Sequence, residues 1–455
     1  MGIYLGQEKI GYSSLFINKA DFQGKPGYRI DSSGLMRVLV RGENVEQNLE
    51  STSYLDEDFG PMRETFKMSS AGHTTTVTAS FSPDEIVAEV ESGGTKSTKR
   101  IPIPPGSRMF GDGSVSPTAM ELKVGDKLDL KFFEPVSVRL DEARIEVLRK
   151  EDIELHGRKY EALVIRSRTS LGETTYWHDE KGNLLKSVSG IMGVGMTMIR
   201  EPKEKAQSLR TDGAYTPPPD LAVMTVCPAN IEIPKPRQVT YMKVRLIGLA
   251  DKALVINDHR QKATFSNGSK PAAVYEITAS DFDPAKAASL PIKTAGMEEF
   301  LAESPYVQSA NAEIAEAAKQ IIGDEKNARA AVSRLRAWVN SNMQTRGDIG
   351  ILRSSVDILH AKNGVCRDFA LLYTALARAA GIPTKFVTGL MYLEGGFYYH
   401  AWAESFVGEW IPVDPTLSTD FVDATHIKLA EGDTTAMFDV VKAVGTLKAE
   451  IIGFE

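Results

Sequence analysis

The feature that most restricts the fold is a nearly unbroken apolar run at residues 369–376, in which Thr374 is the one polar residue. A helix that is apolar on all sides has to be buried in the protein interior. Gly381, followed by Ile382-Pro383, is typical of a helix end. The run therefore predicts a buried helix over residues 366–380, with Cys366 in its first turn.

Three strands are predicted to follow this helix, over residues 385–393, 397–407 and 410–413, because glycine-containing turns separate them. His400 lies in the second strand, and Asp414 directly follows the third. A cysteine, a histidine and an aspartate can act as the nucleophile, the base and the orienting group of an activated thiol. The predicted catalytic residues are Cys366, His400 and Asp414.

The position of Cys366 suits thiol chemistry. At a helix start, unpaired backbone N–H groups and the positive end of the helix dipole lower the pKa of a thiol and can stabilise an oxyanion. Gly364 allows a sharp entry into the helix and lets a substrate approach closely. Gly364, Tyr399 and Trp402 are the predicted substrate-cleft residues, with packing in the core as the alternative for the two aromatic side chains.

The turn between the second and third strands decides whether His400 and Asp414 can meet. A two-residue turn at Gly408-Glu409 would place their side chains on opposite faces of the sheet, because side chains alternate along a strand. A three-residue loop, or a bulge near Pro412, would place Asp414 diagonal to His400 and within reach. The catalytic hypothesis therefore predicts such a loop or bulge.

Each of these residues alone also has an ordinary structural explanation. A lone cysteine at a helix start is usually a small buried residue, and a histidine among aromatic residues is often part of a core. Cys227 lies in an apolar patch, where a buried, inert thiol is expected. The order of the three segments, the glycine before Cys366 and the helix–strand–strand context together favour a catalytic site.

The 455-residue chain is too long for one ordinary domain. Residues 1–205 contain short segments rich in β-branched residues, which predict a β-rich domain, either a sandwich or a curved, barrel-like sheet. Residues 206–300 are predicted to form a linker, which includes the proline-rich segment 216–220, and a small β unit. Helical periodicity begins near residue 300, so residues 301–455 are the predicted α+β catalytic domain.

Composition excludes several classes of partner and site. The formal net charge of -7 and the lack of a basic run argue against a nucleic-acid partner. Two cysteines and seven scattered histidines give no metal-ligand spacing, so neither a metal nor another cofactor is expected. No apolar run is long enough for a membrane span, and no signal peptide is visible.

Three segments resemble the bacterial transglutaminase-like superfamily, a branch of the papain-like fold. They are Gly364-Val365-Cys366-Arg367-Asp368-Phe369-Ala370, Tyr399-His400-Ala401-Trp402-Ala403-Glu404 and Trp410-Ile411-Pro412-Val413-Asp414-Pro415-Thr416. The resemblance implies Cys366 as nucleophile, His400 as base and acid, and Asp414 as orienting group. His426 matches a position typical of the family, to which no chemistry is assigned. Members that resemble the animal enzymes use calcium, but no acidic loop here points to it.

We expect the Cys366 thiolate to attack a carboxamide or peptide carbonyl of a protein or peptide substrate and to form an acyl-thioester. Resolution by water would make the chain a peptidase or amidase, and resolution by an amine would make it a transglutaminase. The alternative is a catalytically silent binding or assembly module of the cell envelope, in which Cys366 is buried or unreactive and lacks a contact with His400. A ligand-carrying β-barrel with an accessory enzyme domain is a third possibility.

The expected location is extracytoplasmic, in the periplasm or cell envelope. Two features favour it: the abrupt start of the chain in a strand pattern, and a loose resemblance of the first half to a multi-domain subgroup of the family. A cytoplasmic location is the alternative.

Overall fold

A computed structural model describes the chain except for residues 112–119, 191–194, 209–218 and 280–281. Contacts group the chain into two compact units, Met1–Glu91 with Thr98–Met224, and Ser92–Ser97 with Thr225–Glu455. Much of the predicted proline-rich linker, residues 216–218, lies outside the described residues, and the predicted boundaries at 206 and 301 stay predictions. Among the described residues, no helix is long and apolar enough to cross a membrane.

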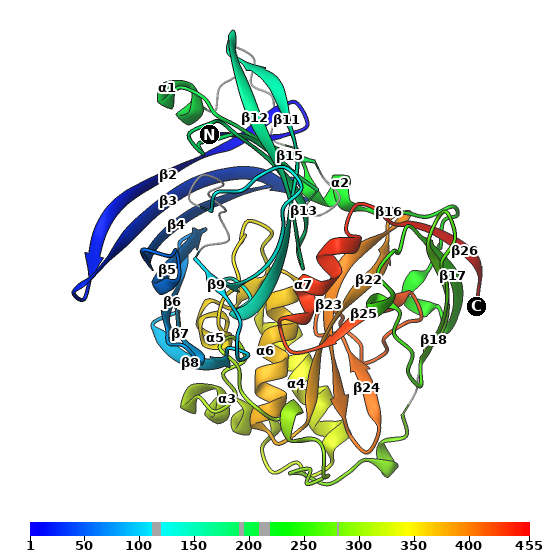
Figure 1. Cartoon of the computed structure of the whole chain (residues 1–455). Coiled ribbons are helices and arrows are strands. Elements are labelled where there is room, and N and C mark those ends of the chain that lie inside the picture. The colour runs from blue at the N-terminus through cyan, green and yellow to red at the C-terminus, as the bar shows by residue number, and fades with distance from the viewer. Residues whose placement is uncertain (112–119, 191–194, 209–218, 280–281) are drawn as a thin grey trace. The chain divides into compact units, whose positions relative to one another are not determined.

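The first unit is built on one sheet of fifteen strands, in the order β8 to β1 followed by β15 to β9. The ribbon of this sheet is strongly curved (Figure 1), and the predicted β-rich region is therefore confirmed as a curved sheet. The strands are β1 (Gly2–Leu5), β2 (Glu8–Phe22), β3 (Lys25–Val40), β4 (Glu43–Asp56), β5 (Pro61–Ser70), β6 (His73–Phe81), β7 (Glu85–Ser92), β8 (Thr95–Pro102), β9 (Met109–Phe110), β10 (Lys127–Glu134), β11 (Arg139–Leu155), β12 (Arg158–Thr169), β13 (Gly172–His178), β14 (Leu184–Ser189) and β15 (Met196–Ile199). Two short helices, α1 (Lys203–Gln207) and α2 (Leu221–Thr225), follow the last strand.

Tight turns explain why neighbouring strands pair. Gln23-Gly24 joins β2 to β3 and His156-Gly157 joins β11 to β12, and all four residues have positive φ angles between 52° and 80°. This is the geometry of a type I′ turn, whose twist matches that of the strands it connects. Glycine adopts the second position without steric cost.

The second unit contains a five-stranded sheet with helices on one face and a second, four-stranded sheet on the other. The five-stranded sheet is antiparallel and contains β16 (Cys227–Pro228), β22 (Thr384–Leu393), β23 (Gly396–Phe406), β24 (Trp410–Val413) and β25 (His426–Gly432). The helices on that face are α3 (Ala312–Ile322), α4 (Ala328–Asn342), α5 (Ser355–Ala361) and α6 (Cys366–Ala379). A short helix, α7 (Ala436–Asp439), contributes instead to the core between the two sheets. Short 3₁₀ helices occur at η2 (Pro236–Gln238), η3 (Lys252–Leu254), η4 (Pro284–Lys286), η5 (Glu298–Phe300) and η6 (Val440–Ala443).

Helix α6 is the centre of this unit. All of residues 368–378 are buried, with α3, α4 and α5 packed against α6 and with β22 and β23 also in contact with it. The buried helix predicted over residues 366–380 is therefore confirmed almost to the residue. Gly323, with a φ of 57°, caps the C-terminus of α3.

The four-stranded sheet covers the other face of the five-stranded sheet. Its strands, in spatial order, are β18 (Gln261–Ser266), β19 (Ala272–Thr278), β17 (Tyr241–Ile247) and β26 (Lys448–Phe454). Val244 and Tyr275 from this sheet share one apolar core with Leu390, Phe397 and Ile427 from the other. The C-terminal strand β26 therefore completes a sheet whose remaining strands precede α3, a pairing that the sequence did not predict.

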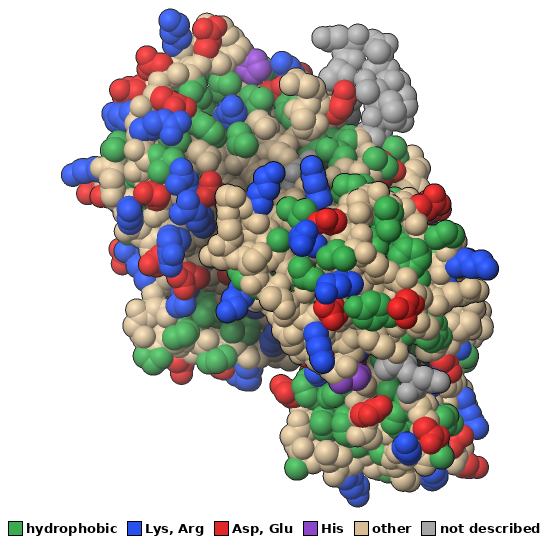
Figure 2. All heavy atoms as spheres, turned by 90° about the vertical axis from the view of Figure 1, so that its right-hand side faces the viewer, with side chains coloured by type: hydrophobic (Ala, Val, Ile, Leu, Met, Phe, Trp, Pro, Cys, Tyr) green, Lys and Arg blue, Asp and Glu red, His purple; other side chains and the backbone are tan. Residues whose placement is uncertain are grey.

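Charged side chains of both signs are interspersed on the face of the molecule drawn in Figure 2. Lys and Arg number 53 against 60 Asp and Glu in the whole chain. A nucleic-acid site of the usual kind requires a clustered basic surface. The expectation that nucleic acid is not a partner stays a prediction.

Candidate active site

Helix α6 begins at Cys366, and its neighbours fix this start. Gly364 has a φ of 153°, and a Cβ there would lie 2.5 Å from the side chain of Asp368. Asp368 accepts a hydrogen bond from the Val365 N–H at 3.0 Å, as a capping carboxylate does. Asp368 and Arg353 are both fully buried, with Asp368 Oδ1 3.5 Å from Arg353 Nη2. Cys366 is thereby held at the helix N-terminus with its side chain partly exposed.

The hairpin of β23 and β24 brings His400 and Asp414 together. Phe406 pairs with Trp410, so three residues form the loop, and Gly408 within it has a φ of 120°. This register places Asp414 diagonal to His400 on the same face of the sheet. The three-residue, glycine-containing loop predicted from strand parity is therefore confirmed.

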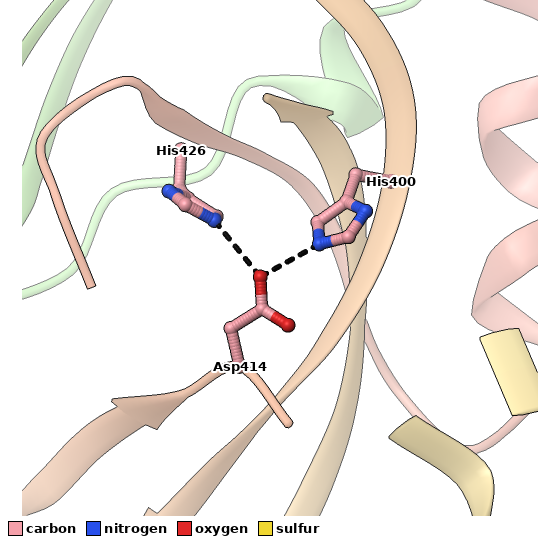
Figure 3. A group of neighbouring side chains, drawn as sticks. All are labelled: His400, Asp414 and His426. Atoms are coloured by element: carbon pink, nitrogen blue, oxygen red, sulfur yellow. Dashed lines mark hydrogen bonds and ion pairs between the residues drawn. The ribbon is translucent and has the colours of Figure 1, made fainter. Parts of the chain in front are cut away.

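The Asp414 carboxylate is fully buried and fully hydrogen-bonded. Its Oδ2 atom accepts from His400 Nε2 at 2.7 Å and from His426 Nε2 at 3.2 Å (Figure 3). Its Oδ1 atom accepts from Thr416 N–H at 2.8 Å and from Thr416 Oγ1 at 2.7 Å. Burial by itself would raise the pKa of Asp414, but the nearby imidazoles hold it well below its usual range.

His400 and Cys366 shift each other's ionisation. Burial would lower the pKa of His400, but the Asp414 carboxylate and the Cys366 sulfur raise it to about 10. Burial would raise the pKa of Cys366, but the charge and hydrogen bond of His400, together with a hydrogen bond to the Ala401 backbone, lower it overall. The pair therefore favours a thiolate beside an imidazolium.

The two ring nitrogens of His400 have different partners. Since Nε2 donates to Asp414, Nδ1 is the nitrogen that remains to interact with Cys366. An aspartate that fixes one imidazole nitrogen leaves the other free to exchange a proton with the nucleophile. This arrangement can perform nucleophilic acyl chemistry.

The two aromatic residues predicted for the cleft have packing positions. Trp402 is fully buried, and its ring stacks on His400 with ring centroids 6.1 Å apart. Tyr399 packs against the core between the two sheets, on the opposite face of β23 from His400. Cys227 belongs to the same core, and burial raises the pKa of its thiol to about 12. Packing, the alternative stated for Tyr399 and Trp402, is the role that these positions favour.

His426 is the part of the site to which sequence reasoning gave no role. It starts β25, which pairs with β22, so β22 separates it from the strand that carries His400. Contacts across an intervening strand leave no spacing signal in the sequence. The one hint was the position of His426 in the family pattern.

His400, Asp414 and His426 also form a donor set of the kind that binds a transition metal, because their ligand atoms lie within 4.8 Å of one another. Both contacts to Asp414 have hydrogen-bond lengths. We therefore describe the set as a hydrogen-bonded group. The expectation that neither a metal nor a cofactor takes part stays a prediction.

Residues 315–415 match the family model of the transglutaminase-like superfamily. The match contains Cys366, His400 and Asp414 and stops before His426. The uncharacterized protein ML0607 of Mycobacterium leprae (strain TN) is 30% identical over 137 residues, which cover 28% of the chain and 48% of that protein. The chain thus spans about half the length of the curated relative it matches.

Three solved structures are similar at low TM-scores and show no more than a distant likeness. The structure named "Putative Cysteine Protease from Cytophaga hutchinsonii" is 21% identical, with a TM-score of 0.35 over 48% of the chain and 86% of that structure. The β-barrel-like protein of unknown function DUF1849 from Brucella abortus is 10% identical, with a TM-score of 0.33 over 44% and 93%. The periplasmic domain of TgpA from Pseudomonas aeruginosa, bound to ethylmercury, is 14% identical, with a TM-score of 0.29 over 44% and 94%.

Proposed function

The second unit contains a transglutaminase-like domain, and on this premise we propose that the chain catalyses thiol-dependent acyl transfer or hydrolysis on a protein or peptide carboxamide or peptide bond. The observation that carries the proposal is the buried Asp414–His400 hydrogen bond of 2.7 Å. His400 in turn interacts with the partly exposed Cys366, which raises the pKa of the imidazole and lowers that of the thiol. The orienting carboxylate thus contacts the base, and the base contacts the nucleophile, as acyl chemistry through a thiolate requires.

The proposed reaction has two steps. The Cys366 sulfur bonds to the carbonyl carbon, the C–N bond breaks, and the His400 imidazolium gives its proton to the departing amine. Backbone N–H groups at the start of α6 stabilise the oxyanion of the tetrahedral intermediate. In the second step His400 takes a proton from water or from an amine, which attacks the thioester carbonyl and releases the thiolate.

The choice between water and an amine separates a peptidase or amidase from a transglutaminase. An acyl-enzyme protected from water favours transfer to an amine. The proposal includes both routes. The extracytoplasmic location also stays a prediction.

The silent binding module predicts that Cys366 is buried or unreactive and lacks a contact with His400. Cys366 is partly exposed and interacts with His400. The alternative therefore has less support than the enzyme.

Acylation by p-nitrophenyl acetate tests the proposal without knowledge of the natural substrate. We expect a burst of nitrophenolate close to one equivalent per chain, and an acetyl group on the peptide that contains Cys366 by mass spectrometry. A glutamine-containing peptide, offered with and without an alkylamine, then separates hydrolysis from transfer. The absence of a burst, or a label on Cys227 alone, would contradict the proposal.

A further inference from the structure

We propose that His426 is a positioning residue for the active site, held in place by the buried carboxylate of Asp423, which pairs with the partly exposed Arg237. The inference rests on the proposed function, because His426 acts on the reaction through Asp414 and His400. All three residues lie outside the region matched by the family model, residues 315–415.

The first argument is the hydrogen bonding of Asp414. A single oxygen, Oδ2, accepts from the Nε2 atoms of both His400 and His426 (Figure 3). A carboxylate oxygen only accepts, so each imidazole carries its proton on Nε2 toward Asp414. The two imidazoles, 5.8 Å apart between ring centroids and inclined by 67°, therefore fix this oxygen from two directions.

The second argument is the anchoring of His426 itself. Its side chain is fully buried, and its ring packs edge-on against Trp402, 5.4 Å between centroids at 84°. Its Nδ1 atom lies 3.4 Å from Asp423 Oδ1. The ring is therefore held by its packing against Trp402 and by its hydrogen bond to Asp414, with Nδ1 beside the Asp423 carboxylate.

The third argument is that Asp423 is itself held in place. Its fully buried carboxylate accepts from Thr425 N–H at 2.9 Å and from Thr425 Oγ1 at 2.5 Å. Its Oδ2 atom lies 2.8 Å from Arg237 Nη1. Burial would raise the pKa of Asp423, but His426 and Arg237 lower it to about 2. The Asp423 carboxyl group is thus ionised at pH values well above 2.

Together these contacts make a chain from Arg237 through Asp423, His426 and Asp414 to His400. Arg237 belongs to η2, directly before the strands of the four-stranded sheet. The segment outside the matched region therefore supplies the last anchor of the active site. This gives the small β unit a role in catalysis through position rather than through contact with substrate.

Two substitutions test the role of His426. His426→Leu removes the donor, whereas His426→Gln keeps an amide N–H near the position of Nε2. We expect His426→Leu to lower the acylation rate constant of Cys366 by roughly tenfold or more, with KM changed less than about twofold. We expect His426→Gln to recover most of this loss. His178→Leu replaces a buried histidine of the first unit and should leave the rate unchanged.

Coupling to Asp414 excludes a general structural effect. If His426 acts through Asp414, His426→Leu should have little further effect in an Asp414→Asn background. The inference would be contradicted if His426→Leu lowered the acylation rate constant equally in the unmodified chain and in Asp414→Asn. It would also be contradicted if His426→Leu and His426→Gln lowered that rate constant equally at matching melting temperatures.

The iodoacetamide alkylation rate of Cys366 shows whether the positioning role alone is wrong or whether the proposed function is wrong as well. If the rate depends on His400 but not on His426, the positioning role is wrong and the proposed function stands. If it depends on neither, both are wrong.

Discussion

Replacing Cys366 by serine is expected to lower the acylation rate by at least about 10⁴-fold. A serine hydroxyl does not ionise beside His400, so the thiolate–imidazolium pair that holds the pKa of Cys366 down cannot form. The loss should be in the rate constant, because the substituted atom forms the covalent bond to substrate. The nitrophenolate burst measures it directly.

The fold should survive this change. Cys366 is partly exposed. The start of α6 is fixed by the hydrogen bond that Asp368 accepts from the Val365 N–H, and the sulfur takes no part in that bond. The melting temperature of Cys366→Ser should therefore match that of the unmodified chain. Cys227→Ala is the matched control, since it removes the other thiol from the core on the opposite face of β23 from His400 and should keep the burst. A burst of equal size in Cys366→Ser would contradict the account.

Replacing Asp414 by asparagine is expected to lower the acylation rate by about 10³- to 10⁴-fold. An asparagine has one oxygen and one amide NH₂ in place of two acceptors. If the oxygen faces Thr416, the NH₂ meets the Nε2 atoms of His400 and His426, and His400 has to move its proton to Nδ1. That nitrogen is the one needed as base toward Cys366.

The matched control for this prediction is Thr416→Val. Valine keeps the backbone N–H that Asp414 accepts at 2.8 Å and loses the hydroxyl bond at 2.7 Å. The carboxylate and both imidazole bonds remain, so we expect less than about a tenfold change. Equal losses in Asp414→Asn and Thr416→Val would mean that the conformation of the segment that carries these two residues, rather than the Asp414 carboxylate, determines the acylation rate.

Local signals in the sequence were sufficient for the start of α6 and for the hairpin that carries His400 and Asp414. An apolar run bounded by Gly364 and Gly381 leaves few choices for a helix, and strand parity required the loop around Gly408. Both depend on neighbours in sequence.

Contacts between distant segments could not be predicted in this way. His426 reaches Asp414 across β22, and Arg237 reaches Asp423 over 186 positions in sequence. Similarly, the apolar alternation of β26 identifies a strand but not its partner β17. The burial of Trp402 also depends in part on a distant segment, since the ring of His426 packs edge-on against it.

The most direct test of the central claim is the pH dependence of Cys366 alkylation by iodoacetamide, in a Cys227→Ala background with and without His400→Ala. The thiol pKa is lowered and that of His400 is raised to about 10, so the ion pair exists at pH values between the two. We predict rapid alkylation that persists well below the ordinary thiol pKa of about 8.5. In His400→Ala, burial and the Asp414 charge raise the pKa of the thiol and only the Ala401 backbone hydrogen bond lowers it, so the profile should move to higher pH. An ordinary thiol titration that is unchanged by His400→Ala would contradict the account.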